Sequence, residues 1–160
     1  MAGFPAMTKD EGERAGGPVV LLGYPVRLGE QEREHFDEVL REFQLVSAST
    51  RADVPERLMD LARHLSSTYQ ADLSEASRLR DEASARGDAT VDLGYPARPE
   101  SAEFAARWRD LMAEVDAYCA SGALLTLATP PKLLALRSWV LGEFLGQLDG
   151  RPPTPWSPPA

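Results

Sequence analysis

The feature that most constrains the fold is an apolar spacing of three and four residues that recurs along most of the sequence. In the segment from Glu30 to Ser47, the apolar residues that keep this spacing are Phe36, Val39, Leu40, Phe43 and Val46. The spacing places them on one face of a helix, and acidic residues and arginines occupy most of the other positions. We therefore predict a first helix here and a mainly helical fold.

Helix-breaking and capping residues divide the next part of the chain. Pro55 suits the first turn of a second helix, whose apolar stripe consists of Leu58, Leu61, Leu65 and Thr68 or Tyr69. Asp72 and Glu75 have the spacing of a capping box. We therefore expect a break near Gln70 and a third helix over residues 73–86, ended by a glycine.

The last two predicted helices are the most apolar part of the chain. Residues 100–121 carry a continuous apolar stripe, made of Phe104, Trp108, Leu111, Met112, Val115, Tyr118 and Cys119. In the fifth helix, Thr129 is the candidate cap, with Pro130 and Pro131 in the first turn. Its apolar residues cover most of its circumference, so it is either central or offers a second face to a partner. We predict a bundle of four or five helices with these two antiparallel at its centre.

Two short extended segments precede amphipathic helices. Residues 22–25 and 93–96 both read Leu-Gly-Tyr-Pro, and Pro25 excludes a helix through the first of them. The β-branched and aromatic residues around both favour extended structure. Either each is a helix-entry segment whose tyrosine packs on the following helix, or the two are an internal duplication. In both cases they could lie side by side across the bundle.

The domain organisation follows from the composition of the two ends. Residues 1–17 are polar and glycine-rich, so we expect a disordered tail, followed by one helical domain over residues 18–150. Residues 151–160 form a proline-rich tail with Trp156 in it. This tail either docks into an aromatic groove of a partner or folds back so that Trp156 packs on its own domain.

The charge and the cysteine content exclude several functions. The net charge of −8 opposes nucleic-acid binding, and no run of apolar residues is long enough for a membrane span. The single cysteine, Cys119, forms no disulfide within the chain, which suits a reducing compartment, and its place in an apolar stripe favours a buried side chain. We expect a soluble cytoplasmic protein.

No catalytic or cofactor motif occurs in the sequence, so we predict that the protein is not an enzyme and has no cofactor. The chain lacks a phosphate-binding loop, a zinc-binding spacing and a nucleophile elbow. Glu32 and His35 have the spacing that di-iron bundles use, but they have it once only. A metal site remains an alternative if Glu32, His35, Asp60 and His64 converge.

Four segments together resemble small helical proteins of high-GC actinobacteria that have no assigned catalytic residue. The segments are Gly23–Gly29, Asp116–Pro131, Trp139–Phe144 and Gly150–Trp156. The resemblance implies an association with anti-sigma factors and their antagonists, which act by partner switching. A composition rich in alanine and arginine and poor in lysine agrees with a high-GC genome.

These observations favour a regulatory or scaffolding protein-interaction domain, in stress or sigma-factor signalling. The partner is another protein or a second copy, bound through Tyr24, Tyr95, Trp139, Leu141, Leu145 and Trp156. The alternative is a small-ligand or metal sensor with a site between the helices. Its support is a set of aromatic residues, Phe36, Phe43, Trp108, Tyr118, Trp139 and Phe144, which core packing explains equally well.

Overall fold

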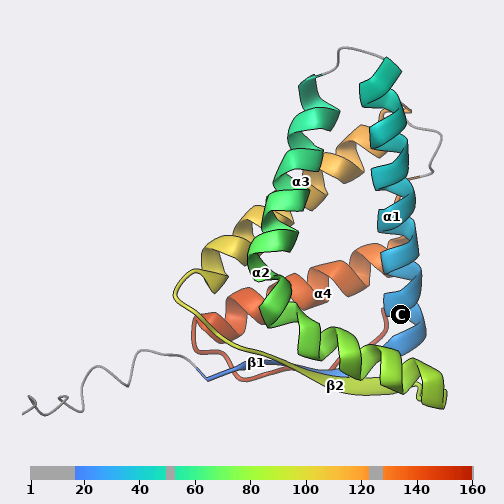
Figure 1. Ribbon diagram of the computed structural model, residues 1–160. Coiled ribbons are helices and arrows are strands. Elements are labelled where there is room, and N and C mark those ends of the chain that lie inside the picture. The colour runs from blue at the N-terminus through green and yellow to red at the C-terminus, as the bar shows by residue number, and fades with distance from the viewer. Residues whose placement is uncertain (1–16, 50–52, 123–127, 160) are drawn as a thin grey trace, which may run out of the picture.

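The computed structural model describes residues 17–49, 53–122 and 128–159, apart from the side chains of residues 46–49, 53–58, 61, 65, 66 and 69. Figure 1 shows the elements. In chain order they are β1 (Val19–Pro25), α1 (Val26–Ser49), α2 (Asp53–Arg86), β2 (Thr90–Tyr95), α3 (Ser101–Ala120) and α4 (Pro131–Leu148). The prediction of a mainly helical chain is confirmed.

The two extended segments form a small antiparallel sheet. Leu21 pairs with Leu93, and Val19 pairs with Tyr95. The register is interrupted between Leu21 and Tyr24, where Gly23 has a φ of 66°. A positive φ is open to glycine because it has no Cβ. The prediction that these segments lie side by side is confirmed.

The predicted break near Gln70 is wrong, because α2 is one helix of 34 residues. The capping box does not form, since Asp72 is in an ion pair with Arg98 at 2.6 Å. In Figure 1 α2 nevertheless changes direction in its middle. The hydroxyl groups of Ser67 and Thr68 both donate to the carbonyl of His64. Side chains that bond back in this way often bend a helix.

The other helix ends differ from prediction in detail. Helix α1 begins at Val26, directly after the strand, and not at Glu30. Thr129 does not cap α4: Pro130 occupies that position, and no side chain caps it. Gly122 and Gly150 have positive φ values of 74° and 91°, as expected for glycines just beyond helix C-termini.

The apolar core consists of two clusters at opposite ends of the molecule. The first cluster joins α1, α2 and α3 through Val39, Phe43, Met59, Ala62, Leu111, Met112, Val115 and Cys119. The second cluster joins the sheet, α2 and α4 through Val19, Leu21, Tyr24, Ala76, Leu93, Tyr95 and Leu136. Cys119 is buried as predicted. The predicted stripe residues Leu58, Leu61, Leu65 and Tyr69 lie outside the described residues.

Helices α3 and α4 cross the space between the two arms that α1 and α2 make (Figure 1). Because of these crossings, the predicted bundle arrangement is not confirmed. Of the helices in the described part of the chain, none has the length and apolar character that a membrane span requires. The space where α3, α4 and the sheet meet α2 is where the site described below lies.

Candidate functional site

A pocket of about 240 Å³ lies between the two apolar clusters. Aromatic rings supply much of its wall: Tyr24, Tyr95, Phe104, Trp108 and Phe144. The ring centroids of Tyr95 and Phe144 are 4.9 Å apart, and those of Phe104 and Trp108 are 6.2 Å apart. These pairs have the separations that aromatic packing favours, so the wall is built from rings that hold one another in place.

Helix α4 presents one stripe of side chains to the pocket. Leu136, Val140 and Phe144, spaced four residues apart, all line it. A second stripe, Trp139, Glu143 and Gln147, has the same spacing. Since residues four apart share a face of a helix, α4 has one face for the pocket and a neighbouring one for other contacts.

The tyrosines of the repeated Leu-Gly-Tyr-Pro segments both reach the pocket. Burial raises the pKa of Tyr24, and it raises the pKa of Tyr95 to about 12. Both hydroxyl groups therefore stay protonated at neutral pH. The ring of Tyr24 packs against the backbone of Gly29, where a Cβ atom would overlap the hydroxyl group.

Arg80 of α2 lies beside the two tyrosines on the pocket wall. Its charge counteracts the effect of burial on the pKa values of Tyr24 and Tyr95. Its Nη2 donates to the hydroxyl of Ser77 at 2.9 Å. Its Nε is buried and has no hydrogen-bond partner, the one such side-chain atom found in the described part of the chain. A buried donor without an acceptor is unfavourable by about 1–3 kcal/mol.

Arg137 of α4 also lines the pocket, but its charge is compensated. Its Nε donates to Oε1 of Glu32 at 2.7 Å, and its Nη1 donates to both carboxylate oxygens of Asp116, at 3.0 and 3.1 Å. The arginine is 9% exposed. Burial raises the pKa of Glu32, although the Arg137 guanidinium opposes this. The network ties α1, α3 and α4 together beside the pocket.

Thr129 extends this network to His35. Its hydroxyl donates to Asp116, and its Oγ1 lies 3.1 Å from Nε2 of His35. A hydroxyl has one proton to donate, so the histidine donates through Nε2 to Thr129. The role of Thr129 is thus to join two polar side chains and not to cap α4.

The predicted metal ligands do not converge. Glu32 and His35 belong to the Arg137 network, whereas Asp60 is exposed and pairs with Arg63 at 2.8 Å. His64 is exposed on α2. No group of three or more histidine, cysteine or acidic side chains among the residues that the structure describes could hold a metal ion. The four predicted ligands therefore do not form a metal site in the described part of the chain.

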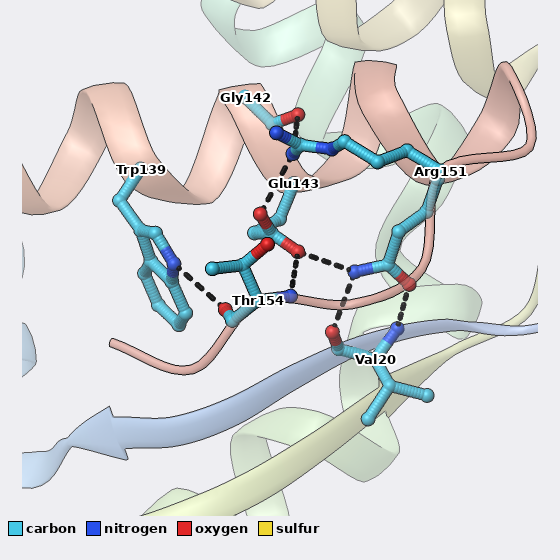
Figure 2. A network of polar contacts seen from close by, with 7 residues as sticks. Val20, Trp139, Gly142, Glu143, Arg151 and Thr154 are labelled. Atoms are coloured by element: carbon cyan, nitrogen blue, oxygen red, sulfur yellow. Dashed lines mark hydrogen bonds and ion pairs between the residues drawn. The ribbon is translucent and has the colours of Figure 1, made fainter. Parts of the chain in front are cut away.

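A second polar network holds the C-terminal segment against the protein. Figure 2 shows the carboxylate of Glu143 between α4 and this segment. Glu143 is 2% exposed and accepts hydrogen bonds from Arg151 at 2.7 Å and from the backbone N–H of Thr154 at 2.8 Å. Gln147 also donates to it, at 2.8 Å. The buried charge is therefore paired with a cation and supplied with several donors, as a buried carboxylate needs.

The same network covers the outer edge of β1. The side-chain amide of Gln147 accepts from the N–H of Val20 at 2.8 Å and donates to its carbonyl at 2.7 Å, as a neighbouring strand would. Two residues further along, the N–H of Trp156 donates to the carbonyl of Leu22 at 2.9 Å. Unpaired strand edges invite association with other chains, and this one is covered by α4 and the C-terminal segment.

The residues predicted to bind a partner lie in three different places in the structure. Tyr24 and Tyr95 are 7% and 9% exposed and line the pocket. Trp139 and Trp156 contact each other at 5.4 Å between ring centroids, and the Trp139 indole donates to the carbonyl of Thr154 (Figure 2). Of the two alternatives for the tail, the structure therefore has Trp156 packed on its own domain.

Leu141 and Leu145 line a shallow groove of about 300 Å³ between α3 and α4. The predicted aromatic set is also divided: Trp108 and Phe144 line the pocket. Phe36, Phe43 and Tyr118 belong to the first cluster, and Trp139 packs at the edge of the second.

Sequence reasoning missed Arg80, Arg137 and Glu143. Arg137 and Glu143 had a usable signal, because they are charges within the most apolar helix of the chain. A charge at such a position needs a buried partner. Arg80 had no signal, since it stands in a helix rich in exposed charges.

Comparison of the chain with protein-family models, with curated proteins and with solved structures finds no match.

Proposed function

We propose that this protein is a non-enzymatic binding domain for a small, mostly apolar molecule that occupies the pocket. The observation that carries the proposal is a pocket of about 240 Å³ walled by five aromatic rings, with few polar groups. Ligand sites in proteins are mostly apolar concave sites with a few placed polar groups. A cavity of about 150 Å³ can bind benzene, so this volume suits a molecule with one ring or a short branched chain.

The position of the pocket supports a regulatory role. All the elements contribute to its wall: for example, Glu32 of α1, Leu73 of α2, Trp108 of α3 and Val140 of α4. A bound molecule would contact side chains of both apolar clusters and stabilise their packing. A ligand that binds the folded state alone stabilises it, and the gain rises with the logarithm of its concentration above the Kd. A partner protein could then distinguish the ligand-bound protein from the ligand-free protein.

The regulatory interaction and the link to sigma-factor signalling remain proposals that rest on the sequence. The same holds for the description of the fold as a bundle. Helix α4 carries both the pocket stripe and the residues that hold the tail, so it is the element through which binding would reach the surface.

Filling the pocket tests the proposal. Val140→Phe adds volume on the pocket stripe of α4, whereas Leu134→Phe changes an exposed position of the same helix, 37% exposed. Thermal unfolding is measured with a panel of compounds that have one ring or a short branched chain. We expect at least one compound to raise the Tm of the wild type and of Leu134→Phe, and Val140→Phe to lose that shift. Equal shifts in all three proteins would contradict binding in the pocket.

A second candidate function is self-association through α3 and α4. The groove lined by Leu141 and Leu145 also contains Met112 and Leu134, and Leu134 is among the most exposed large apolar residues. A second copy would cover this apolar surface. Light scattering on the wild type and on Leu134→Glu tests this: we expect a dimer that the substitution dissociates. A wild type that is monomeric at all accessible concentrations rejects it.

A further inference from the structure

The buried Nε of Arg80 indicates which chemical group the pocket takes. Arg80 lines the pocket, and this atom has no acceptor in the described part of the chain. An arginine side chain has five N–H donors in a planar fork. One of them is bonded to Ser77, and the guanidinium also forms a hydrogen bond with the Tyr24 side chain. The Nε–H has no acceptor. A small shift of the side chain that brings a ligand oxygen to this atom would remove the cost of the buried donor.

The two pocket arginines differ in their charge balance. Arg137 is neutralised by Glu32 and Asp116. Arg80 forms no ion pair with a carboxylate of the residues that the structure describes. The pocket therefore has one arginine that is paired with two carboxylates and one that has no carboxylate partner. An anionic group would be attracted to Arg80 and not to Arg137.

The tyrosine hydroxyl groups add neutral donors at the same place. Tyr24 and Tyr95 line the pocket, and both interact with the charge of Arg80. A protonated phenol donates one hydrogen bond. A carboxylate has two oxygens that accept up to about four hydrogen bonds, so it can use a guanidinium and two phenols together.

We propose that the ligand is a small carboxylic acid, bound with its carboxylate on Arg80 and its apolar part among the aromatic rings of the pocket. This inference rests on the proposed function, because it specifies the chemistry of the molecule in the same pocket. A monocarboxylate with one ring or a branched chain satisfies the volume, the apolar wall and the cationic end together. The carboxylate would give Arg80 the anionic partner that Arg137 already has.

The test compares an acid with its neutral amide of the same shape. Binding of phenylacetate, phenylacetamide and isovalerate to the full chain is measured by calorimetry at pH 7. We expect at least one of the two acids to bind, and phenylacetate to bind at least about ten-fold more tightly than phenylacetamide, since a charge-assisted hydrogen bond is the difference between them.

Two substitutions locate the charge. Arg80→Gln should weaken phenylacetate binding about ten-fold and leave phenylacetamide unchanged. Arg78→Gln is the matched control, because Arg78 is on the same helix but is exposed and paired with Glu75 and Glu82. It should leave both affinities unchanged. Arg80→Lys keeps the charge and serves if the glutamine variant does not fold: it should weaken phenylacetate binding and retain a preference over the amide.

The outcomes separate this inference from the proposed function. Equal affinity for acid and amide in the wild type overturns the carboxylate inference and leaves a ligand pocket in place. The same holds if Arg80→Gln keeps the full acid preference, or if Arg80→Lys binds phenylacetate as tightly as the wild type does. Binding of neither acid, while neutral one-ring compounds still shift the Tm of the wild type, also overturns it alone. Binding of none of the compounds, with no Tm shift, overturns both.

Discussion

At the scale of single residues, burial in the pocket wall changes the pKa values of Tyr24 and Tyr95. Each is a large side chain whose apolar ring packs in the second cluster. Their hydroxyl groups interact with Arg80 at the pocket. Removing the surrounding water disfavours the phenolate, which is why burial raises both pKa values.

The raised pKa of Tyr95 predicts a loss of stability at high pH. Its pKa is about 12 in the folded protein, against 10.0 for the unperturbed group. The folded state therefore keeps its proton where the unfolded state releases it, so the contribution is complete below pH 10 and is lost as the pH rises through 12. Two pKa units correspond to about 2–3 kcal/mol. Urea unfolding at pH 9 to 12 measures this.

Tyr95→Phe is the control for this prediction. Phenylalanine keeps the ring and removes the titrating group, so the variant should lose less stability over the same pH range. If wild type and Tyr95→Phe show the same pH dependence, the hydroxyl of Tyr95 is not the group responsible.

At the scale of elements, α4 and the C-terminal segment depend on each other. The buried carboxylate of Glu143 accepts from Gln147 of α4 itself and from Arg151 and the backbone of Thr154 in the segment. Arg151 in turn lies over Gly146, where a Cβ atom would overlap its guanidinium. The segment also supplies Trp156 to the second cluster and closes the edge of β1. The tail is therefore an integral layer of the domain.

Truncation after Gly150 should destabilise the protein by about 3 kcal/mol. It leaves Glu143 without its cation and exposes apolar surface under Trp156. Truncation after Trp156 is the matched control and should have little effect. Chemical unfolding of the two variants measures the difference. A loss of similar size in both would place the effect in the last four residues instead.

Combining the truncation after Gly150 with Glu143→Gln tests whether the unpaired charge of Glu143 causes the loss of stability. If the unpaired charge of Glu143 causes part of the loss, Glu143→Gln should be less harmful in the truncated protein than in the full chain. Such a departure from additivity is what a double-mutant cycle measures. Additive effects would mean that Glu143 and the tail act independently.

At the scale of the whole molecule, the Arg137 network connects elements that the two apolar clusters hold separately. Glu32 is on α1, Asp116 on α3 and Arg137 on α4. Glu32 and Arg137 also line the pocket between the clusters. Charged hydrogen bonds here fix the relative position of the two halves because their geometry is directional.

Arg137→Met should lower the free energy of unfolding by about 3 kcal/mol, since removing one partner of a buried pair leaves uncompensated charge. Glu32 and Asp116 keep 21% and 25% side-chain exposure, which favours the lower end of the usual range. Arg78→Met is the comparison: its ion pairs are on the surface and should contribute little. Equal losses in the two variants would argue against a structural role for the network.

The sequence determined the elements, because a helical apolar spacing and its breaking residues act locally. Such patterns predict the helix over residues 101–120, the glycines just beyond helix C-termini and the burial of Cys119. The two paired strands could also be predicted from the sequence, since two identical tetrapeptides with prolines favour an extended chain. The predicted break near Gln70 is wrong, since α2 continues through it and Asp72 pairs with Arg98, a contact 26 positions away.

Only the tertiary structure decided where the site lies. Arg80, Tyr24 and Tyr95 belong to three different elements, α2, β1 and β2, and line the same pocket. No local sequence pattern predicts that they lie together. Glu32 and His35 have the spacing of metal ligands, yet Glu32 binds the guanidinium of Arg137 and His35 bonds to the hydroxyl of Thr129. The physical reason is that a spacing fixes which side chains share a face, whereas packing between elements fixes what that face meets.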